Sequence, residues 1–236
     1  MNRTANIKHA FINRHGGVSC EPYDSLNLGE NVGDDPDKVA ENFDIIQQRY
    51  KLNKIARAQQ VHKTDIIEIN HQNYHLEHIC DGFITKCSDI ALMIRHADCQ
   101  AALFSDDRAH VIAAIHCGWR GNIDNIYGKT IGIMQKDFDC SIENIKVAIS
   151  PSLGPDNAEF KTGKALFPLD FQKYQKDNHY NLWEISRQQL LNGGILDKNI
   201  SIAKICSHKD SSDWFSYRQD GVTGRNGSFI ILGENS

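Results

Sequence analysis

The centre of the chain contains a series of short apolar runs separated by polar residues. Residues 90–95, 101–104 and 110–115 are the clearest of them. Runs of this length, without helical spacing, are typical of strands that are buried on both faces. The same pattern predicts further strands at residues 145–149, 201–206 and 228–232.

Segments with helical spacing of apolar residues lie on either side of these runs. In residues 37–50 the apolar positions recur at helical spacing, and Asp35 and Pro36 suit the N-cap and the first helical position. The section before them is rich in turn residues and predicts mainly loops. Further helices are predicted at residues 123–136, 163–176 and 182–192.

The alternation of strands and helices predicts an α/β protein with a mixed sheet. The chain has 236 residues, which suits one large domain with a substantial core. No low-complexity run, repeat or Gly/Ser linker divides it. We therefore expect a single domain over residues 1–236.

Composition narrows the class of function. The net charge is −4, and no basic stripe is present, which argues against nucleic acid or an anionic membrane as a partner. No segment approaches the roughly 20 apolar residues of a membrane span, and the start lacks the apolar region of a secretory signal. The seven cysteines are scattered without a CxxC pair, which argues against a disulfide framework. These features favour the cytoplasm and leave the oligomeric state open.

Two candidate reactive residues follow the central runs. Cys99 lies in the break between two runs, and His116 ends the next one. Reactive groups of α/β proteins gather at the carboxyl ends of strands, so the two side chains could meet. One interpretation is a thiolate activated by an imidazole, as in a metal-free hydrolase or deamidase. The other is a pair of zinc ligands that needs a third donor, which His62 could supply.

Zinc with three protein ligands keeps a fourth position for water or substrate, and it lowers the pKa of that water to about 7. A structural role is also possible for Cys99, because a single cysteine on an apolar strand is usually a core residue.

The loop at residues 118–122 precedes a predicted helix, so it is either an anion site with Arg120 or an ordinary turn. Asp98 is either an acid/base or a turn-former. Arg218 and Arg225 either line a pocket or belong to a turn before the last strand.

An ordered series of motifs carries a family resemblance. In sequence order these are GGVSCEPYDSLNLGENVGDDPDKVAEN, QQVH, HADC, HCGWRG, SLGP and FSYRQDGVTGRNGSFI. They span about residues 9–232 and resemble the YfiH family, whose members are also described as laccase-domain polyphenol oxidases and as a peptidoglycan editing factor. The resemblance implies an α/β sandwich of mixed sheets flanked by helices.

The resemblance also implies a chemistry. The family's zinc ligands fall on His62, Cys99 and His116, which implies one Zn²⁺ per chain, with copper less favoured. The implied activity is a purine nucleoside phosphorylase, a transferase acting on adenosine, inosine and methylthioadenosine with phosphate, together with adenosine deamination, a hydrolase activity. On this basis we predict Cys99, His116 and Asp98 as catalytic residues. The predicted substrate contacts are Asn27, Arg14, Arg120 and Arg218.

The chain departs from the family pattern beside the implied ligands. Lys63 replaces the glycine that usually follows His62, and His96 replaces the threonine of the usual TADC. The other departures are Phe43, Ala101, Cys117 and Ser150. None removes a ligand, so we expect them to affect substrate preference.

Three alternatives to this function make different predictions. A metal-free hydrolase built on Cys99 and His116 would keep its activity after chelation. A copper-dependent phenol oxidase, an oxidoreductase, normally needs many histidines in close HxH pairs, and the sequence has no such pair. A binding protein for quality control of cell-wall precursors would bind a muropeptide precursor without turning over nucleosides.

Overall fold

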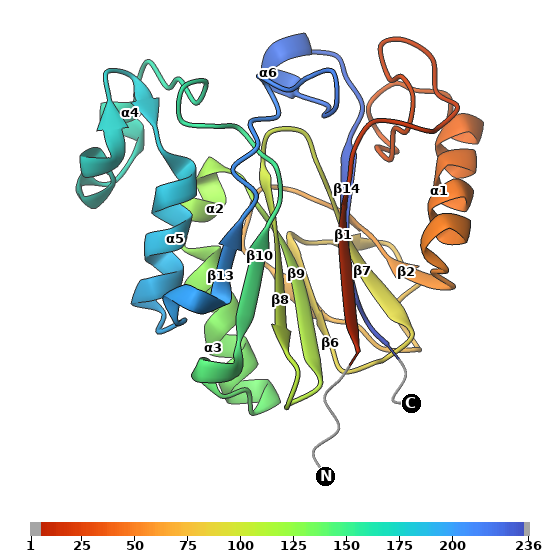
Figure 1. Ribbon diagram of the computed structural model, residues 1–236, viewed down its shortest axis with the longest axis horizontal. Helices are drawn as coiled ribbons and strands as arrows, with labels where there is room; N and C mark the ends of the chain where they lie inside the picture. The colour runs from red at the N-terminus through yellow and green to blue at the C-terminus, as the bar shows by residue number, and fades with distance from the viewer. Residues whose placement is uncertain (1–5, 234–236) are drawn as a thin grey trace.

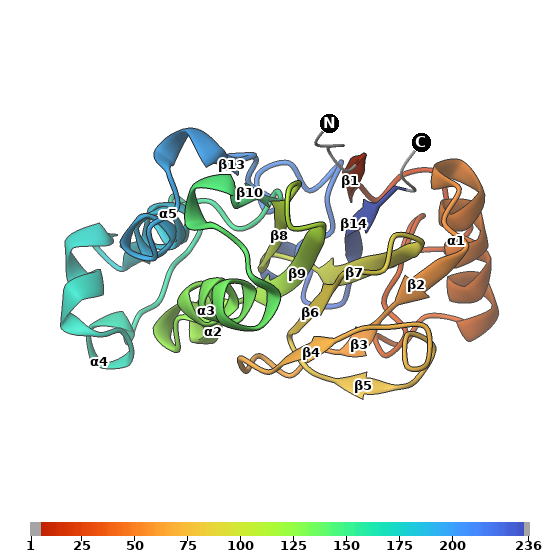
Figure 2. The same ribbon diagram turned by 90° about the horizontal axis from the view of Figure 1, so that it is seen from below.

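Two β-sheets pack face to face and helices cover both outer faces (Figures 1 and 2). The structure, a computed structural model, describes residues 6–233. One buried cluster lies between the sheets, a second lies between the first sheet and the helix after Asp35, and a third lies beneath the helices of the other face. The expected α/β sandwich of mixed sheets flanked by helices is therefore confirmed.

Both sheets contain parallel and antiparallel pairs. The first sheet is ordered β1 (Ile7–Ile12), β14 (Asn226–Leu232), β7 (Ile90–His96), β2 (Lys54–Ala56), and only β2 pairs in parallel. The second is ordered β13 (Ile200–Ile202), β10 (Lys146–Ile149), β8 (Gln100–Asp106), β9 (Val111–Cys117), β6 (Gly82–Thr85), β4 (Ile66–Glu68). Two small ribbons pair β3 (Ala58–Gln59) with β5 (His78–Ile79) and β11 (Gln175–Lys176) with β12 (His179–Tyr180).

Helices lie on both outer faces of the sandwich and at one end of it (Figure 1). The α-helices are α1 (Pro36–Tyr50), α2 (Trp119–Ile123), α3 (Ile126–Phe138), α4 (Gly163–Leu166), α5 (Leu182–Asn192) and α6 (Tyr217–Asp220). Short 3₁₀ turns are η1 (Ile142–Asn144), η2 (Leu169–Tyr174) and η3 (Asp197–Asn199). The Asp35 carboxylate accepts a hydrogen bond from the backbone N–H of Asp37, which confirms the predicted cap. Within the described chain no helix combines the length and apolarity that crossing a bilayer requires.

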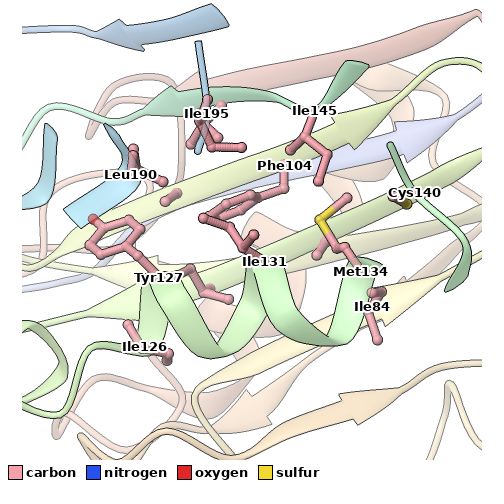
Figure 3. Close-up of a cluster of buried hydrophobic side chains, with 14 of the residues drawn as sticks. Ile84, Phe104, Ile126, Tyr127, Ile131, Met134, Cys140, Ile145, Leu190 and Ile195 are labelled. Carbon is pink, nitrogen blue, oxygen red and sulfur yellow. The ribbon is translucent and has the colours of Figure 1, made fainter. Parts of the chain in front are cut away.

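The core beneath α3 shows why the central apolar runs form strands. Phe104 of β8 and Ile131 and Met134 of α3 are all buried in one cluster (Figure 3). The opposite face of the same strands is also buried, against the first sheet, through residues such as Leu103 and Ile112. Strands covered on both faces need apolar residues at every position, which explains the continuous runs in the sequence.

The structure corrects several predicted boundaries. The helix predicted at residues 163–176 is wrong: α4 ends at Leu166 and η2 begins only at Leu169. Pro168 has no N–H to continue the helix and favours the extended backbone seen at Phe167. The strand predicted at 201–206 is the short β13, the strand β1 was not predicted, and the loop predicted at residues 118–122 contains helix α2.

Candidate metal centre

Three side chains from separate segments meet at one end of the sandwich. His116 lies in β9, Cys99 lies in the turn where the chain passes from β7 in one sheet to β8 in the other, and His62 follows β3. Their ligand atoms all lie within 4.8 Å of one another. The Sγ of Cys99 is 4.0 Å from His62 Nε2, and the two imidazole rings are nearly perpendicular with centroids 4.8 Å apart.

Asp81 joins two of these segments and was missed by the sequence reasoning. Its fully buried carboxylate lies 2.9 Å from His116 Nδ1. It also accepts hydrogen bonds from the backbone N–H groups of Val61, His62 and Lys63 at 3.2, 2.9 and 2.7 Å. Burial opposes its charge, but the bonds to His116 and to these amides outweigh burial and lower the pKa of Asp81. The sequence feature that could have identified Asp81 is its position directly before the apolar strand β6, because a carboxylate buried there needs hydrogen-bond partners.

The cysteine and the buried histidine perturb each other. Burial alone would raise the pKa of Cys99, but the nearby His116 and His62 lower it to about 6. Burial alone would lower the pKa of His116, but Cys99 and Asp81 raise it to about 9. At neutral pH the metal-free site therefore holds a thiolate beside an imidazolium.

The donor set suits zinc. A thiolate and two imidazoles are soft and borderline ligands, whereas magnesium and calcium prefer oxygen. The carboxylate of Asp81 engages His116 Nδ1, which leaves Nε2 as the ligand atom and fixes the ring, a partnership common among metal-binding histidines. His62 is exposed and Cys99 is half-buried, so the cluster is open on one side.

The backbone around the cluster is shaped to bring the ligands together. His62 and Asp98 both adopt positive φ angles, 59° and 85°, which non-glycine residues rarely do. Such conformations cost energy and concentrate at functional sites. Gly118 packs closely against two of the three side chains, since a Cβ there would lie 3.0 Å from Cys99 Sγ and 3.2 Å from His62 Cδ2, both tighter than an ordinary contact.

The ligands form part of the wall of a cavity of about 630 Å³. One part of the lining is aromatic and apolar, with Trp119, Phe160, Leu182 and Tyr217. The charged residues of the lining are Arg95, Arg120, Arg218, Arg225, Glu30 and Asp98. A mainly apolar cavity with a few convergent polar groups is typical of a small-molecule site.

Asp98 is heavily engaged in this wall. Its carboxylate accepts hydrogen bonds from Ser207 Oγ at 2.8 Å, from Ser216 Oγ at 2.6 Å and from the backbone N–H of Arg218 at 2.6 Å. The side chain of Arg218 donates to the carbonyls of Asn157 and Glu159. Asp98 thus ties the turn before Cys99 to helix α6.

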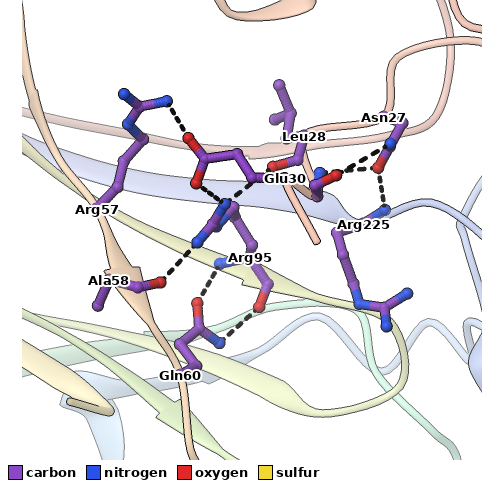
Figure 4. Close-up of polar contacts among 9 residues, drawn as sticks. Asn27, Leu28, Glu30, Arg57, Ala58, Gln60, Arg95 and Arg225 are labelled. Carbon is purple, nitrogen blue, oxygen red and sulfur yellow. Dashed lines mark hydrogen bonds and ion pairs between the residues drawn. The ribbon is translucent and has the colours of Figure 1, made fainter. Parts of the chain in front are cut away.

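The other predicted substrate contacts divide into two groups. Arg120 lines the cavity and stacks on Trp119, with its guanidinium carbon 4.1 Å from the ring centroid. Arg14 lies outside the lining and donates to the backbone carbonyls of Asp24 and Ser211. Asn27 also lies outside the lining; it is fully buried, and its Oδ1 accepts from the backbone N–H of Arg225 (Figure 4).

An ion-pair network that sequence reasoning did not detect supports the cavity edge. Glu30 pairs with Arg57 at 2.8 Å and with Arg95 at 2.5 Å (Figure 4). Gln60 exchanges two hydrogen bonds with the backbone of Arg95. Because Gln60 stands two residues before His62, this network helps to position the segment that carries His62.

Comparisons with known proteins agree with this architecture. A protein-family model described as "Multi-copper polyphenol oxidoreductase laccase" matches residues 8–233. A protein of Bacteroides thetaiotaomicron named "Purine nucleoside phosphorylase" is 30% identical over 97% of this chain and 92% of its own length. "Purine nucleoside phosphorylase YfiH" of Escherichia coli is 32% identical over 93% of this chain and 91% of its own length. The crystal structure of a Bacillus licheniformis hypothetical protein YfiH matches with a TM-score of 0.89 at 24% identity, covering 98% of this chain and 97% of that one.

Proposed function

The chain belongs to the YfiH family, and from this premise we propose that it is a zinc-dependent purine nucleoside phosphorylase. Its substrates would be adenosine, inosine and methylthioadenosine, with adenosine deamination as a second activity. The observation that carries the proposal is the cluster of His62, Cys99 and His116 in the wall of an arginine-lined cavity. Relatives similar over nearly their whole length bear the name purine nucleoside phosphorylase. We place the protein in the cytoplasm, since its described cysteines are all free.

His62, Cys99 and His116 would hold one zinc ion per chain. When bound, zinc supplies a Lewis acid and lowers the pKa of a coordinated water. The surrounding residues hold the ligand side chains in orientation and in the protonation state that binds metal. Asp81 holds the His116 ring through Nδ1, and Cys99 stays deprotonated because its pKa is lowered to about 6.

The cavity offers complementary surfaces for a nucleoside and phosphate. Trp119 and Phe160 provide aromatic faces on which a purine stacks. Guanidinium groups bind phosphate through two parallel hydrogen bonds, and Arg120, Arg218 and Arg225 all line the cavity. We assign phosphate binding to arginine side chains rather than to a helix end, because Arg120 lies inside the five-residue helix α2.

We assign three of the predicted residues a positioning role instead of direct contact with the substrate. Asp98 already accepts three hydrogen bonds, so we assign it the positioning of Cys99 and α6 rather than proton transfer. Asn27 would place the backbone of Arg225, and Arg14 would hold residues near Ser211. These roles make the cavity wall rigid, which accurate substrate placement requires.

One observation favours a second candidate. Asp81, His116 and Cys99 form a chain of carboxylate, imidazole and thiolate, the arrangement that activates a nucleophilic cysteine in metal-free hydrolases. This enzyme would keep its activity after chelation, and iodoacetamide would label Cys99. Copper oxidase chemistry has less support, since residues 6–233 hold one metal-ligating cluster of this kind.

The test is incubation of the purified protein with adenosine, with and without phosphate, followed by separation of the products. Phosphorolysis predicts adenine that appears only with phosphate. Deamination predicts inosine under both conditions. The absence of adenine, inosine and hypoxanthine would contradict the proposal. Repeating the assay after chelation separates the zinc enzyme, which loses activity, from the cysteine hydrolase.

A further inference from the structure

The cavity beside the metal ligands has an excess of positive charge, although the chain as a whole carries a net charge of −4. Its lining has four arginines and two carboxylates. The two carboxylates are occupied: Glu30 pairs with Arg57 and Arg95, and Asp98 accepts three hydrogen bonds. Guanidinium charge that the lining does not neutralise favours an anionic ligand.

Arg225 is fixed in this lining by neutral groups. Its Nη1 donates to the carbonyls of Thr223 at 2.9 Å and Gly224 at 3.0 Å, and its backbone N–H donates to Asn27 Oδ1 at 2.8 Å. Within residues 6–233 no carboxylate pairs with its guanidinium. Burial disfavours the charge and lowers its pKa. The side chain is therefore a positioned cation whose Nε and Nη2 donors have no hydrogen-bond partner among the described residues.

His96 lies at the end of β7 and is one of the residues that line the same cavity. The residue is 2% exposed, and its Nε2 lies 2.8 Å from Ser228 Oγ. Its Nδ1 is buried and has no hydrogen-bond partner in the part of the chain that the structure describes. Burial and the charges of His116 and Arg225 lower the pKa of His96 to about 3, so the ring is neutral.

The hydrogen bonds around this ring favour one position for its proton. A neutral imidazole has one N–H donor and one acceptor nitrogen. Ser228 is fully buried, and among the described residues its hydroxyl bonds only to His96. If that hydroxyl donates to Nε2, its own proton is satisfied and the imidazole proton lies on Nδ1. The opposite assignment would leave both the hydroxyl proton and the Nδ1 lone pair unsatisfied in the core, whereas this one leaves only the Nδ1–H without a partner. His96 thus presents a buried N–H donor that lacks an acceptor.

The geometry points to an oxyanion subsite in which the Nδ1–H of His96 and the guanidinium of Arg225 bind inorganic phosphate. The inference rests on the proposed function for the choice of phosphate as the anion. Both groups offer donors only, and anionic oxygen accepts without donating. A neutral donor beside a fixed cation binds a phosphate oxygen without adding a second buried charge. Because His96 is a departure from the family pattern, this contact is specific to chains that carry a histidine here.

The experiment is calorimetric titration of the metal-loaded protein with inorganic phosphate, which needs no turnover. His96→Leu removes the donor, whereas His96→Asn keeps a side-chain N–H close to the position of Nδ1. His9→Leu is the matched control, since His9 is exposed on β1. We expect phosphate affinity to fall about tenfold or more in His96→Leu, and to stay within about threefold in His96→Asn and His9→Leu. Arg225→Lys, which removes the planar fork, is expected to weaken phosphate binding similarly.

Unchanged phosphate affinity in His96→Leu would overturn the subsite, as would a loss of nucleoside affinity alone. If His96→Leu does not fold, unchanged affinity in Arg225→Lys overturns it. The proposed function is tested separately. Phosphate binding that depends on His96 without nucleoside cleavage supports the subsite and contradicts the function. Cleavage with the same phosphate KM in wild type and His96→Leu contradicts the subsite and leaves the function standing.

Discussion

Asp81 positions two of the three proposed metal ligands, His116 through its side chain and His62 through its backbone. A single buried carboxylate orients the imidazole through Nδ1 and holds the backbone of the segment that carries His62. Two of the three ligands therefore depend on a residue that does not itself belong to the cluster. Groups that orient a metal-binding histidine commonly affect metal affinity strongly.

Asp81→Asn is expected to weaken zinc binding by about 10–100-fold, because the amide is a poorer acceptor for the His116 N–H and no longer favours binding through Nε2. Competition with a chromogenic chelator measures the affinity. Asp65→Asn is the control, since Asp65 is exposed and lies 3.8 Å from Lys129. Equal zinc affinity in Asp81→Asn and wild type would contradict the role assigned to Asp81.

The reactivity of Cys99 in zinc-free protein depends on its lowered pKa. The thiolate is the reactive form, so a pKa of about 6 predicts fast alkylation by iodoacetamide at pH 7 that declines as the pH falls below 6. An unperturbed thiol, with a pKa of about 8.5, already slows about tenfold per unit below pH 8. Cys80, whose pKa burial raises to about 11, should remain unlabelled in the folded protein. Mass spectrometry of labelled peptides gives each rate, and a Cys99 profile that declines below pH 8 would show that the pKa of this thiol is not lowered.

At the scale of elements, the two glycines Gly118 and Gly132 provide a matched comparison. Gly118→Ala should weaken zinc binding about threefold to tenfold, since its Cβ would lie 3.0 Å from Cys99 Sγ and the sulfur would have to shift slightly from its position. Gly132→Ala, in α3 with no atom within 4 Å of the added Cβ, should leave zinc affinity unchanged and stabilise the fold by about 0.5–1 kcal/mol. Zinc titration and denaturant unfolding measure the two effects. Similar zinc affinities for both variants would show that Gly118 is not needed for close approach.

Elements whose packing is reflected locally in the sequence were predictable. The buried strands β7, β8 and β9 are continuous apolar runs, and Asp35 and Pro36 predict the N-terminus of α1. The elements that were missed depend on distant partners. β1 is a strand because it pairs along its full length with β14, more than 200 residues later in the chain. The break in the helix predicted at 163–176 was readable from Pro168 and was overlooked.

The same division applies to the site. His62, Cys99 and His116 follow from motifs, because the ligand types and their order survive in the sequence. The role of Asp81 does not, since its partners lie 18–20 and 35 residues away and meet it only in the folded sheet. Arg14 and Asn27 carry suitable side chains, yet folding commits them to backbone contacts outside the cavity.

At the scale of the whole molecule, the proposed metal ligands lie where the chain passes from one sheet to the other. The turn bearing Cys99 joins β7 of one sheet to β8 of the other, and His116 ends β9. Zinc that binds only the folded state stabilises it by about 2.7 kcal/mol at a free concentration one hundred times its Kd. For a protein of this size that corresponds to a rise in Tm of roughly 5–10 °C. Thermal unfolding with and without a chelator tests this, and a Tm that chelation does not change would contradict a zinc site in the folded protein.

A zinc-dependent phosphorylase is tested most directly by measuring zinc content and phosphate-dependent inosine cleavage together, in wild type and Cys99→Ala. We expect about one zinc per wild-type chain and release of hypoxanthine with ribose 1-phosphate only when phosphate is present. Cys99→Ala should lose both the zinc and the cleavage while remaining folded. Wild-type protein that binds zinc but releases no hypoxanthine, or cleavage that persists in metal-free Cys99→Ala, would rule out a zinc-dependent phosphorylase.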